Sequence, residues 1–195
     1  MECPLNRNWN SKKECRSFFK SLCAQEFAQG LAQNQQQLNQ ALQGFMLKQS
    51  GTWGAYRALK EEASVEEVFK ISRVTWAFPK MIEGALEFYL GQDFTPGFYG
   101  VMEPSAQSPK VAVTDLQGVL VPGLVFNKNG NRLGKGKGFY DKTLETYRGI
   151  KVGICFDFQI SPDTLPTEAH DVKVDYLITE SGVVACRDFH KEDQE

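Results

Sequence analysis

A basic, glycine-rich segment is the part of this sequence best suited to chemistry. It reads Arg132-Leu133-Gly134-Lys135-Gly136-Lys137-Gly138 and places three positive charges within six positions. Glycine lets an anion approach the backbone closely, arginine binds phosphate oxygens bidentately, and lysine acts as a mobile point charge. The segment therefore predicts a polyphosphate site. It is neither a Walker A loop nor a dinucleotide-binding fingerprint, because its glycines alternate at every second position.

The position of this segment between two predicted elements supports the same interpretation. An apolar run at 119–126 predicts a buried strand before it, and residues 140–147 predict a helix after it. In an α/β sheet such a junction presents backbone N–H groups and the positive end of a helix dipole at the carboxyl edge. Asp141 follows in the first turn of that helix. A flexible basic turn is the alternative, and this placement disfavours it.

A second candidate site lies just before the last predicted strand of the sheet. Asp171 and Asp175 flank the start of that strand. A carboxylate at a sheet edge beside bound phosphates is a natural partner for Mg²⁺. Taken alone, Asp171 is also typical of a turn or cap residue, and His170 is typical of a loop histidine. The sequence leaves both interpretations of Asp171 open.

The N-terminal quarter of the chain is predicted to be helical. Residues 11–49 contain no proline and are rich in Gln, Leu, Ala and Lys, with apolar residues spaced by three and four. The pattern breaks near Gly30, which predicts two helices with one buried stripe each. The glutamine-rich run at 33–37 is interpreted as the solvated face of the second helix.

From residue 52 onward, short apolar strands alternate with helices. Ser64 and Glu67 predict a capping box at the start of a helix, Pro79 is expected to end a strand, and 91–118 is predicted to be a long loop. The alternation implies a single three-layer α/β domain over 1–195, with a mostly parallel sheet, helices on both faces and a tail at 181–195. The predicted strands are 53–59, 74–78, an added antiparallel strand at 86–90, 119–126 interrupted by Pro-Gly, 150–156 and 174–179.

Composition narrows the class of protein. The 195 residues carry 22 Lys and Arg against 24 Asp and Glu, and this net charge of -2 argues against a general nucleic-acid binder. No apolar run approaches the ~20 residues that span a bilayer, and the first residues do not resemble an export signal. The five cysteines form no CxxC pair, which is typical of reduced thiols packed in a cytoplasmic protein.

Five ordered blocks over about residues 12–180 resemble the 5-formyltetrahydrofolate cyclo-ligases, also called methenyltetrahydrofolate synthetases. The fourth block is the most specific, and Asn127 departs from the aspartate usual in the family. The blocks are Lys12-Lys13-Glu14-Cys15-Arg16; Tyr56 through Val65 with Glu62; Gly100-Val101-Met102-Glu103-Pro104; Val121 to Phe126 with Arg132 to Asp141; and Gln159, Pro166, His170-Asp171, Val174-Asp175 and Thr179-Glu180.

The resemblance implies an ATP-dependent ligase that converts 5-formyltetrahydrofolate, whose tail can be polyglutamylated, into 5,10-methenyltetrahydrofolate. ATP phosphorylates the formyl oxygen, N10 attacks the activated carbon, and phosphate departs. The resemblance also implies Mg²⁺, no nucleic-acid or membrane partner, and a monomer in the cytoplasm. The implied ATP site is Lys12, Arg16, Arg132, Gly134, Lys135, Gly136, Lys137, Gly138, Phe139 and Tyr140; the folate site is Glu62, Tyr140 and Lys135; the metal ligands are Asp141 and Asp171.

Two other functions compete with this one. A ligase of the same family acting on a different small substrate would differ only in its pterin contacts, of which Glu62 is one. A non-catalytic nucleotide- or RNA-binding module would also use a basic glycine segment, with aromatic residues as stacking platforms. Retention of the protein on heparin or on single-stranded nucleic acid at low salt would indicate such a binding module. Trp53, Trp76, Phe88 and Phe98 could stack on folate rings, but we expect each in the core.

Overall fold

The computed structural model describes residues 9–91, 93–97 and 100–186 of the chain. Its centre is an eight-stranded sheet of order β12-β11-β10-β7-β1-β2-β3-β6. The five strands from β11 to β2 in this order are parallel to one another. Antiparallel pairing adds β12 beside β11 at one end of the sheet, and β3 and then β6 beside β2 at the other. The strands are β1 (Gly51–Gly54), β2 (Val74–Ile82), β3 (Ala85–Leu90), β6 (Lys110–Val111), β7 (Gly118–Pro122), β10 (Ile150–Ile154), β11 (Tyr176–Thr179) and β12 (Gly182–Ala185).

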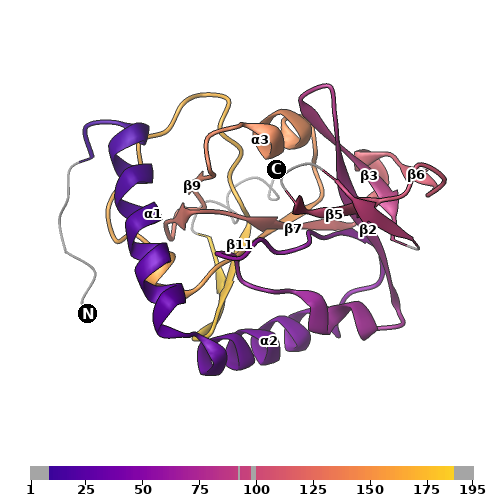
Figure 1. Ribbon diagram of the computed structural model, residues 1–195, viewed down its shortest axis with the longest axis horizontal. Coiled ribbons are helices and arrows are strands. Elements are labelled where there is room, and N and C mark those ends of the chain that lie inside the picture. Colours follow the sequence, from indigo (N-terminus) through magenta and orange to yellow (C-terminus); the bar gives the residue numbers. More distant parts are fainter. Residues whose placement is uncertain (1–8, 92, 98–99, 187–195) are drawn as a thin grey trace, which may run out of the picture.

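Helices cover both faces of this sheet, as the sequence predicts (Figure 1). Helix α2 (Ala32–Met46) buries Leu38, Leu42 and Met46 in one core cluster with Trp53. Helix α3 (Phe139–Leu144) buries Leu144 in the cluster on the opposite face. The mostly parallel α/β architecture is therefore confirmed.

Helix α1 (Lys12–Gln29) packs at the side of the sheet rather than on a face (Figure 1). Ser11 caps it, because the Ser11 hydroxyl accepts a hydrogen bond from the Glu14 N–H at 3.2 Å. Its buried stripe of Cys15, Phe19 and Cys23 lies against a small hairpin and its surroundings. That packing holds the first turn of α1 beside the glycine-rich segment.

The small hairpin pairs β8 (Val125–Phe126) with β9 (Arg132–Leu133). The predicted strand 119–126 is thus divided at Pro-Gly into β7 and β8, which belong to different sheets. The side-chain oxygen of Asn127 accepts from the N–H groups of Asn129 and Asn131, both at 3.1 Å, and shapes the turn. The hairpin leads the chain directly into the glycine-rich segment.

Two strand predictions need correction. Strand β1 ends at Gly54 rather than at residue 59, and the chain beyond it leaves the sheet. Pro79 does not end its strand: it lies within β2 and pairs with Phe88 of β3. Strand β1 pairs with β2 only as far as Gly54 and Ala77, two residues before Pro79. On the β1 side of β2, the N–H that Pro79 lacks is therefore not needed for pairing.

The predicted capping box is also wrong. Residues Glu66–Lys70 form a short 3-10 helix, η1, with no side-chain cap. The side chain of Gln35 instead accepts from the Ser64 N–H at 2.8 Å and donates to the Ser64 carbonyl at 2.9 Å. A contact with α2 therefore decides the local conformation, and the sequence around Ser64 does not reveal it.

The remaining differences concern lengths of elements. The predicted loop 91–118 contains β4 (Phe94–Pro96), β5 (Met102–Pro104), β6 and the 3-10 helix η3 (Val113–Asp115). Strand β12 lies where a tail was expected and pairs with β11. Helix α3 ends at Leu144, and β10 and β11 are each two residues shorter than predicted. A 3-10 turn, η4 (Asp157–Gln159), follows β10.

The predicted core aromatics and thiols are buried where the structure describes them. Trp53 and Phe88 are fully buried and Trp76 nearly so, whereas Phe98 lies outside the described residues. Cys15, Cys23, Cys155 and Cys186 are buried, and Cys3 lies outside the described residues. Burial raises the pKa of both Cys15 and Cys23 to about 11. No helix in the described part of the chain could cross a membrane.

Candidate active site

One large cavity of about 1100 Å³ opens beyond the carboxyl ends of β7 and β1. This is the edge at which open α/β sheets bind ligands. The cavity exceeds the range of roughly 300–1000 Å³ that is usual for single-ligand pockets, so it has room for two substrates. Its lining includes every residue predicted for the site: Lys12, Arg16, Glu62, Arg132, Gly134, Lys135, Gly136, Lys137, Gly138, Phe139, Tyr140, Asp141 and Asp171.

The glycine-rich segment forms the floor of the cavity between β9 and α3. Gly136 has φ 101° and Gly138 has φ 67°, a left-handed region that favours glycine. Gly138 caps α3, and its carbonyl accepts from the Lys142 N–H at 3.0 Å. The alternating glycines therefore serve the backbone path of the turn as well as the approach of an anion.

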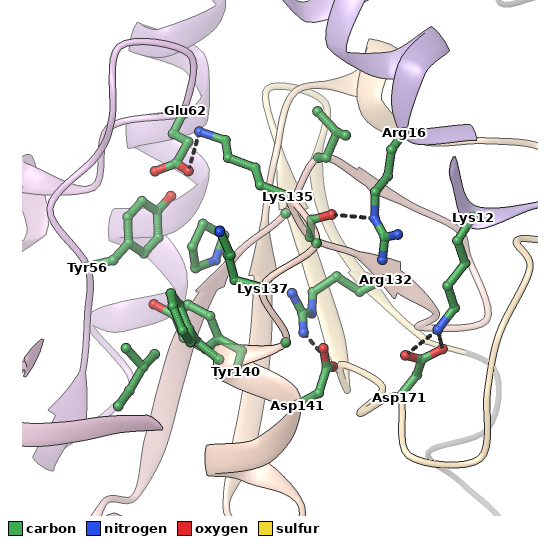
Figure 2. Close-up of a pocket in the computed structure, with 18 of the residues that line it drawn as sticks. Lys12, Arg16, Tyr56, Glu62, Arg132, Lys135, Lys137, Tyr140, Asp141 and Asp171 are labelled. Atoms are coloured by element: carbon green, nitrogen blue, oxygen red, sulfur yellow. Dashed lines mark hydrogen bonds and ion pairs between the residues drawn. The ribbon is translucent and has the colours of Figure 1, made fainter. Parts of the chain in front are cut away.

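Helix α1 contributes two cations to the rim of the cavity (Figure 2). The Nε atom of Arg16 donates to the carbonyl of Gly134 at 3.1 Å. The Nζ atom of Lys12 lies 2.6 Å from Oδ2 of Asp171 and 2.7 Å from a carboxylate oxygen of Glu168. These contacts join the first turns of α1 to the glycine-rich segment and to the loop before β11.

The ion pair of Lys12 with Asp171 changes the pKa of both groups. Burial alone would raise the pKa of Asp171, but the hydrogen bond and charge of Lys12 and the Glu168 N–H lower it below its ordinary value. Burial alone would lower the pKa of Lys12, but its two carboxylate partners raise it. Both groups are therefore charged at neutral pH.

Arg132 and Asp141 form a second ion pair deeper in the cavity. The Nη2 atom of Arg132 lies 2.6 Å from Oδ1 of Asp141, and the Arg132 side chain is only 4% exposed. Oδ1 of Asp141 also accepts from the Val172 N–H at 3.3 Å. The guanidinium of Arg132 lies over the ring of Tyr140, 5.7 Å from its centroid.

Glu62 and two tyrosines stand on the other side of the glycine-rich segment (Figure 2). Oε1 of Glu62 lies 3.0 Å from Nζ of Lys135, and Oε2 accepts from the Leu59 N–H at 3.0 Å. The Tyr56 hydroxyl donates to the carbonyl of Ala63 at 2.7 Å. Burial first, and the charge of Glu62 second, raise the pKa of Tyr56 and of Tyr140, so both hydroxyls stay protonated.

Lys137 differs from the other cations of the cavity. Figure 2 shows its amine extending between Tyr56 and Arg132 without a dashed contact. Within the part of the chain that the structure describes, no acceptor or carboxylate is recorded as its partner. Its charge is therefore available to a bound anion.

Sequence reasoning missed the apolar wall of the cavity and two charged residues on it. Tyr56 was assigned to a strand, while Arg57 and Glu103 lay within family-like blocks but were given no role in the site. The guanidinium of Arg57 packs 4.4 Å from the ring centroid of Phe94. The wall is assembled from segments far apart in the sequence: Pro79, Met81, Leu86, Val101, Pro122 and Leu124.

The acidic residues of the rim fit a magnesium ion held together with phosphates. Mg²⁺ prefers carboxylate oxygens and is usually bound by one or two carboxylates plus substrate phosphates and water. Asp141 and Asp171 both line the cavity and offer such carboxylates, and the Asp141 carboxylate accepts from the N–H of Val172, the residue after Asp171. Glu168, His170 and Asp171 also bring their ligand atoms within 4.8 Å of one another.

Comparison with known families agrees with this geometry. The model of the 5-formyltetrahydrofolate cyclo-ligase family matches residues 8–180. The chain belongs to this family. The resemblance drawn from the sequence motifs is thus confirmed, and the matched range includes the whole cavity lining.

Individual cyclo-ligase relatives match the chain over different lengths. A probable 5-formyltetrahydrofolate cyclo-ligase of Schizosaccharomyces pombe is 34% identical over 48% of this chain and 52% of its own length. The cyclo-ligase of Mus musculus is 40% identical over 33% of this chain and 34% of its own length. These two alignments thus span about half and about one third of the relatives' own lengths. The cyclo-ligase of Mycoplasma genitalium is 25% identical over 73% of this chain and 82% of its own length.

Solved structures extend the comparison to the whole cyclo-ligase fold. The 5,10-methenyltetrahydrofolate synthetase of Aquifex aeolicus is 27% identical, with a TM-score of 0.76 over 94% of this chain and 99% of that one. The synthetase of Mycoplasma pneumoniae shares the fold at 24% identity, with a TM-score of 0.67 over 85% of this chain and 98% of that one.

Proposed function

We propose that this protein converts 5-formyltetrahydrofolate and ATP into 5,10-methenyltetrahydrofolate, ADP and phosphate. Family membership supports the proposal. The observation that carries it is the division of one cavity into two ends. Cations and glycines gather at one end, and an apolar wall with Glu62 and two tyrosines forms the other. A polyphosphate and a folate fit these two ends.

The reaction proceeds in two steps. The formyl oxygen attacks the γ-phosphorus of ATP, the bond to the bridging oxygen breaks, and ADP leaves. N10 then attacks the activated formyl carbon and loses its proton, and the carbon–oxygen bond breaks. The former formyl oxygen departs within inorganic phosphate. Such phosphoryl transfer depends on positioning and on neutralising charge.

The phosphate end consists of residues that supply charge and backbone donors. Arg132, Lys135 and Lys137 neutralise the phosphates, and backbone N–H groups around Gly134, Gly136, Gly138 and Phe139 donate to them. Lys12 and Arg16 approach the nucleotide from α1. Lys137 has no recorded partner among the described residues, so it can follow the transferred charge without first breaking an ion pair.

Asp141 and Asp171 would hold Mg²⁺ beside the phosphates. The ion, when bound, neutralises phosphate charge and helps to align the β- and γ-phosphates. In the absence of nucleotide, Arg132 and Lys12 keep these two carboxylates in place. Both cations then exchange part of their contact for phosphate oxygens when ATP binds.

The folate end orients the reacting groups. Glu62 accepts hydrogen bonds from the pterin, and Tyr140 lines the same part of the pocket. Lys135 joins the two ends, because it pairs with Glu62 at 3.0 Å while belonging to the phosphate-binding segment. It therefore lies where the formyl oxygen meets the γ-phosphate.

Turnover measured by absorbance tests the proposal. Purified protein with ATP, Mg²⁺ and 5-formyltetrahydrofolate should produce the near-ultraviolet band of methenyltetrahydrofolate, and omitting any one component should abolish it. Folded protein that binds ATP but gives no product would favour a family member acting on a different small substrate.

A further inference from the structure

Glu103 is a buried carboxylate of the cavity that the functional assignment above does not use. It lies in β5, lines the cavity and is only 8% exposed. No hydrogen bond or ion pair joins its carboxylate to any residue that the structure describes. Glu62 differs, since one of its oxygens meets Lys135 and the other meets the Leu59 N–H.

Two cations of this region have partners other than Glu103, although Nε of Arg57 is buried without a hydrogen-bond partner among the described residues. Lys80 donates to the carbonyl of Pro104 at 3.4 Å, and Arg57 pairs with Glu66 at 2.9 Å. The Glu103 carboxylate remains open to the cavity, where a ligand can reach it. A ligand that covered this carboxylate without supplying donors would cost free energy, so the position favours a ligand with hydrogen-bond donors.

The backbone beside Glu103 holds the carboxylate at this place. Strand β4 pairs with β5, with Thr95 opposite Glu103. Just after β4, a Cβ added at Gly97 would lie 2.3 Å from Cδ of Glu103 and 2.5 Å from its Oε2. A larger residue at Gly97 would therefore displace the end of the Glu103 side chain from the position that it has beside β4.

The chemistry around Glu103 limits which part of the substrates can lie against it. A phosphate or a glutamyl carboxylate would be repelled by its charge. The 2-amino group and N3–H of a pterin, in contrast, form a pair of adjacent donors that matches the two oxygens of one carboxylate. The apolar side chains of Met81, Leu86 and Val101 line the same cavity and suit the faces of a ring.

We propose that Glu103 is a substrate-positioning residue that accepts hydrogen bonds from the 2-amino group and N3–H of the pterin. This inference rests on the proposed function, because it takes the folate as given. Glu62, which Lys135 links to the phosphate-binding segment, then accepts a hydrogen bond from N8–H, the single N–H of the reduced ring once N5 carries the formyl group. Two carboxylates thus fix the pterin at both of its donor-bearing sides.

The test compares Glu103→Gln with Glu87→Gln as a matched control. Glu87 is a glutamate of β3 that lies outside the cavity lining and pairs with Lys110 at 2.8 Å. Two ligands are titrated into each protein, 5-formyltetrahydrofolate and the fragment 5-formyl-6-methyltetrahydropterin, which lacks the aminobenzoyl-glutamate. ATP affinity and thermal unfolding of the ligand-free protein are measured in parallel.

Glu103→Gln should weaken both the folate and the fragment by the same factor, about 10- to 150-fold for one charge-assisted hydrogen bond. ATP affinity should not change, the Tm of the free protein should not fall, and Glu103→Asp should restore part of the affinity. If Glu103→Gln weakens binding of the folate but not of the fragment, Glu103 contacts the aminobenzoyl-glutamate part of the folate, and the proposal is overturned. If the variant has a lower Tm and loses affinity for ATP and for folate equally, Glu103 has a structural role, and the proposal is overturned as well.

Failure of the proposed function gives a different result. In that case the wild-type protein binds neither the folate nor the fragment and forms no methenyltetrahydrofolate, and the inference falls with it. If the wild type turns over while Glu103→Gln binds both ligands as tightly as the wild type, only the role of Glu103 is refuted.

Discussion

The guanidinium of Arg132 and the carboxylate of Asp141 meet at 2.6 Å across the glycine-rich segment. Arg132 belongs to β9, before the segment, and Asp141 to the first turn of α3, after it. The ion pair therefore fixes both ends of a turn whose glycines would otherwise leave it flexible. It also sets a carboxylate and a nearly buried cation side by side where phosphates and Mg²⁺ are expected.

Asp141→Asn should impair metal-dependent turnover and also lower stability. The variant keeps a hydrogen-bond acceptor for Arg132 but loses its charge, which should cost about 1–2 kcal/mol in the free energy of unfolding. Turnover should fall most at limiting Mg²⁺ and recover in part at high Mg²⁺. Glu145→Gln, an exposed change just after α3, is the control for both measurements. Normal turnover at limiting Mg²⁺ would show that Asp141 serves only Arg132.

Lys137→Ala should lower kcat more than it raises the KM for ATP. Loss of one charge-assisted phosphate contact costs about 1.5–3 kcal/mol, or roughly 10- to 150-fold. An effect mainly on kcat means that the contact strengthens in the transition state. Steady-state kinetics with Lys142→Ala, an exposed lysine of α3 outside the cavity, provide the comparison. If the two substitutions have equal effects on kcat and on the KM for ATP, Lys137 does not contact the phosphates.

Glu62→Gln should raise the KM for folate and leave ATP binding unchanged in the absence of folate. The change removes the charge that meets Lys135 and the pterin, but it keeps the side-chain volume. The expected loss of folate affinity is about 10-fold or more. Glu61→Gln alters the exposed neighbour and should have no such effect. A comparable loss of ATP affinity would mean that Glu62 acts through Lys135 on the phosphate end.

The pair of Lys12 and Asp171 should stabilise the protein over a defined pH range. The pKa of Asp171 lies below its ordinary 3.8, so its contribution is present above pH 3.8 and is lost as the pH falls below that value. The pKa of Lys12 lies above its ordinary 10.5, so its contribution is lost only as the pH rises beyond 10.5.

Asp171→Asn should therefore destabilise the protein by up to about 1 kcal/mol at pH 7. The difference from wild type should vanish as the pH falls well below 3.8. Urea unfolding across this range measures it, with the exposed Asp115→Asn as the control. A difference that persists at pH 2 would point to lost packing rather than lost charge.

Local sequence patterns predicted the phosphate end of the site. The alternation of glycine and lysine, set between a buried strand and a helix, depends only on neighbouring residues. The motif order then placed Lys12, Glu62 and Asp171 with that segment, although they are far from it in the sequence. The structure brings all of them to one cavity.

The apolar wall could not be predicted in the same way, because it forms only when β2, β3 and β5 come together. Tyr56 was assigned to a strand since 53–59 is mostly apolar, and only the end of β1 at Gly54 shows that the run turns into the cavity. Ser64 has the local signal of a helix cap, but Gln35 of α2 occupies its backbone groups. Such contacts between distant segments are what local patterns do not contain.

The fate of the formyl oxygen tests the proposed reaction most directly. The protein is supplied with ATP, Mg²⁺ and 5-formyltetrahydrofolate that carries ¹⁸O in its formyl group, and the released phosphate is analysed by mass spectrometry. Phosphorylation of that oxygen predicts one ¹⁸O atom in each phosphate formed, in step with methenyltetrahydrofolate. Unlabelled phosphate, or ¹⁸O found in formate, would contradict the account, because ATP hydrolysis would then not pass through the formyl oxygen.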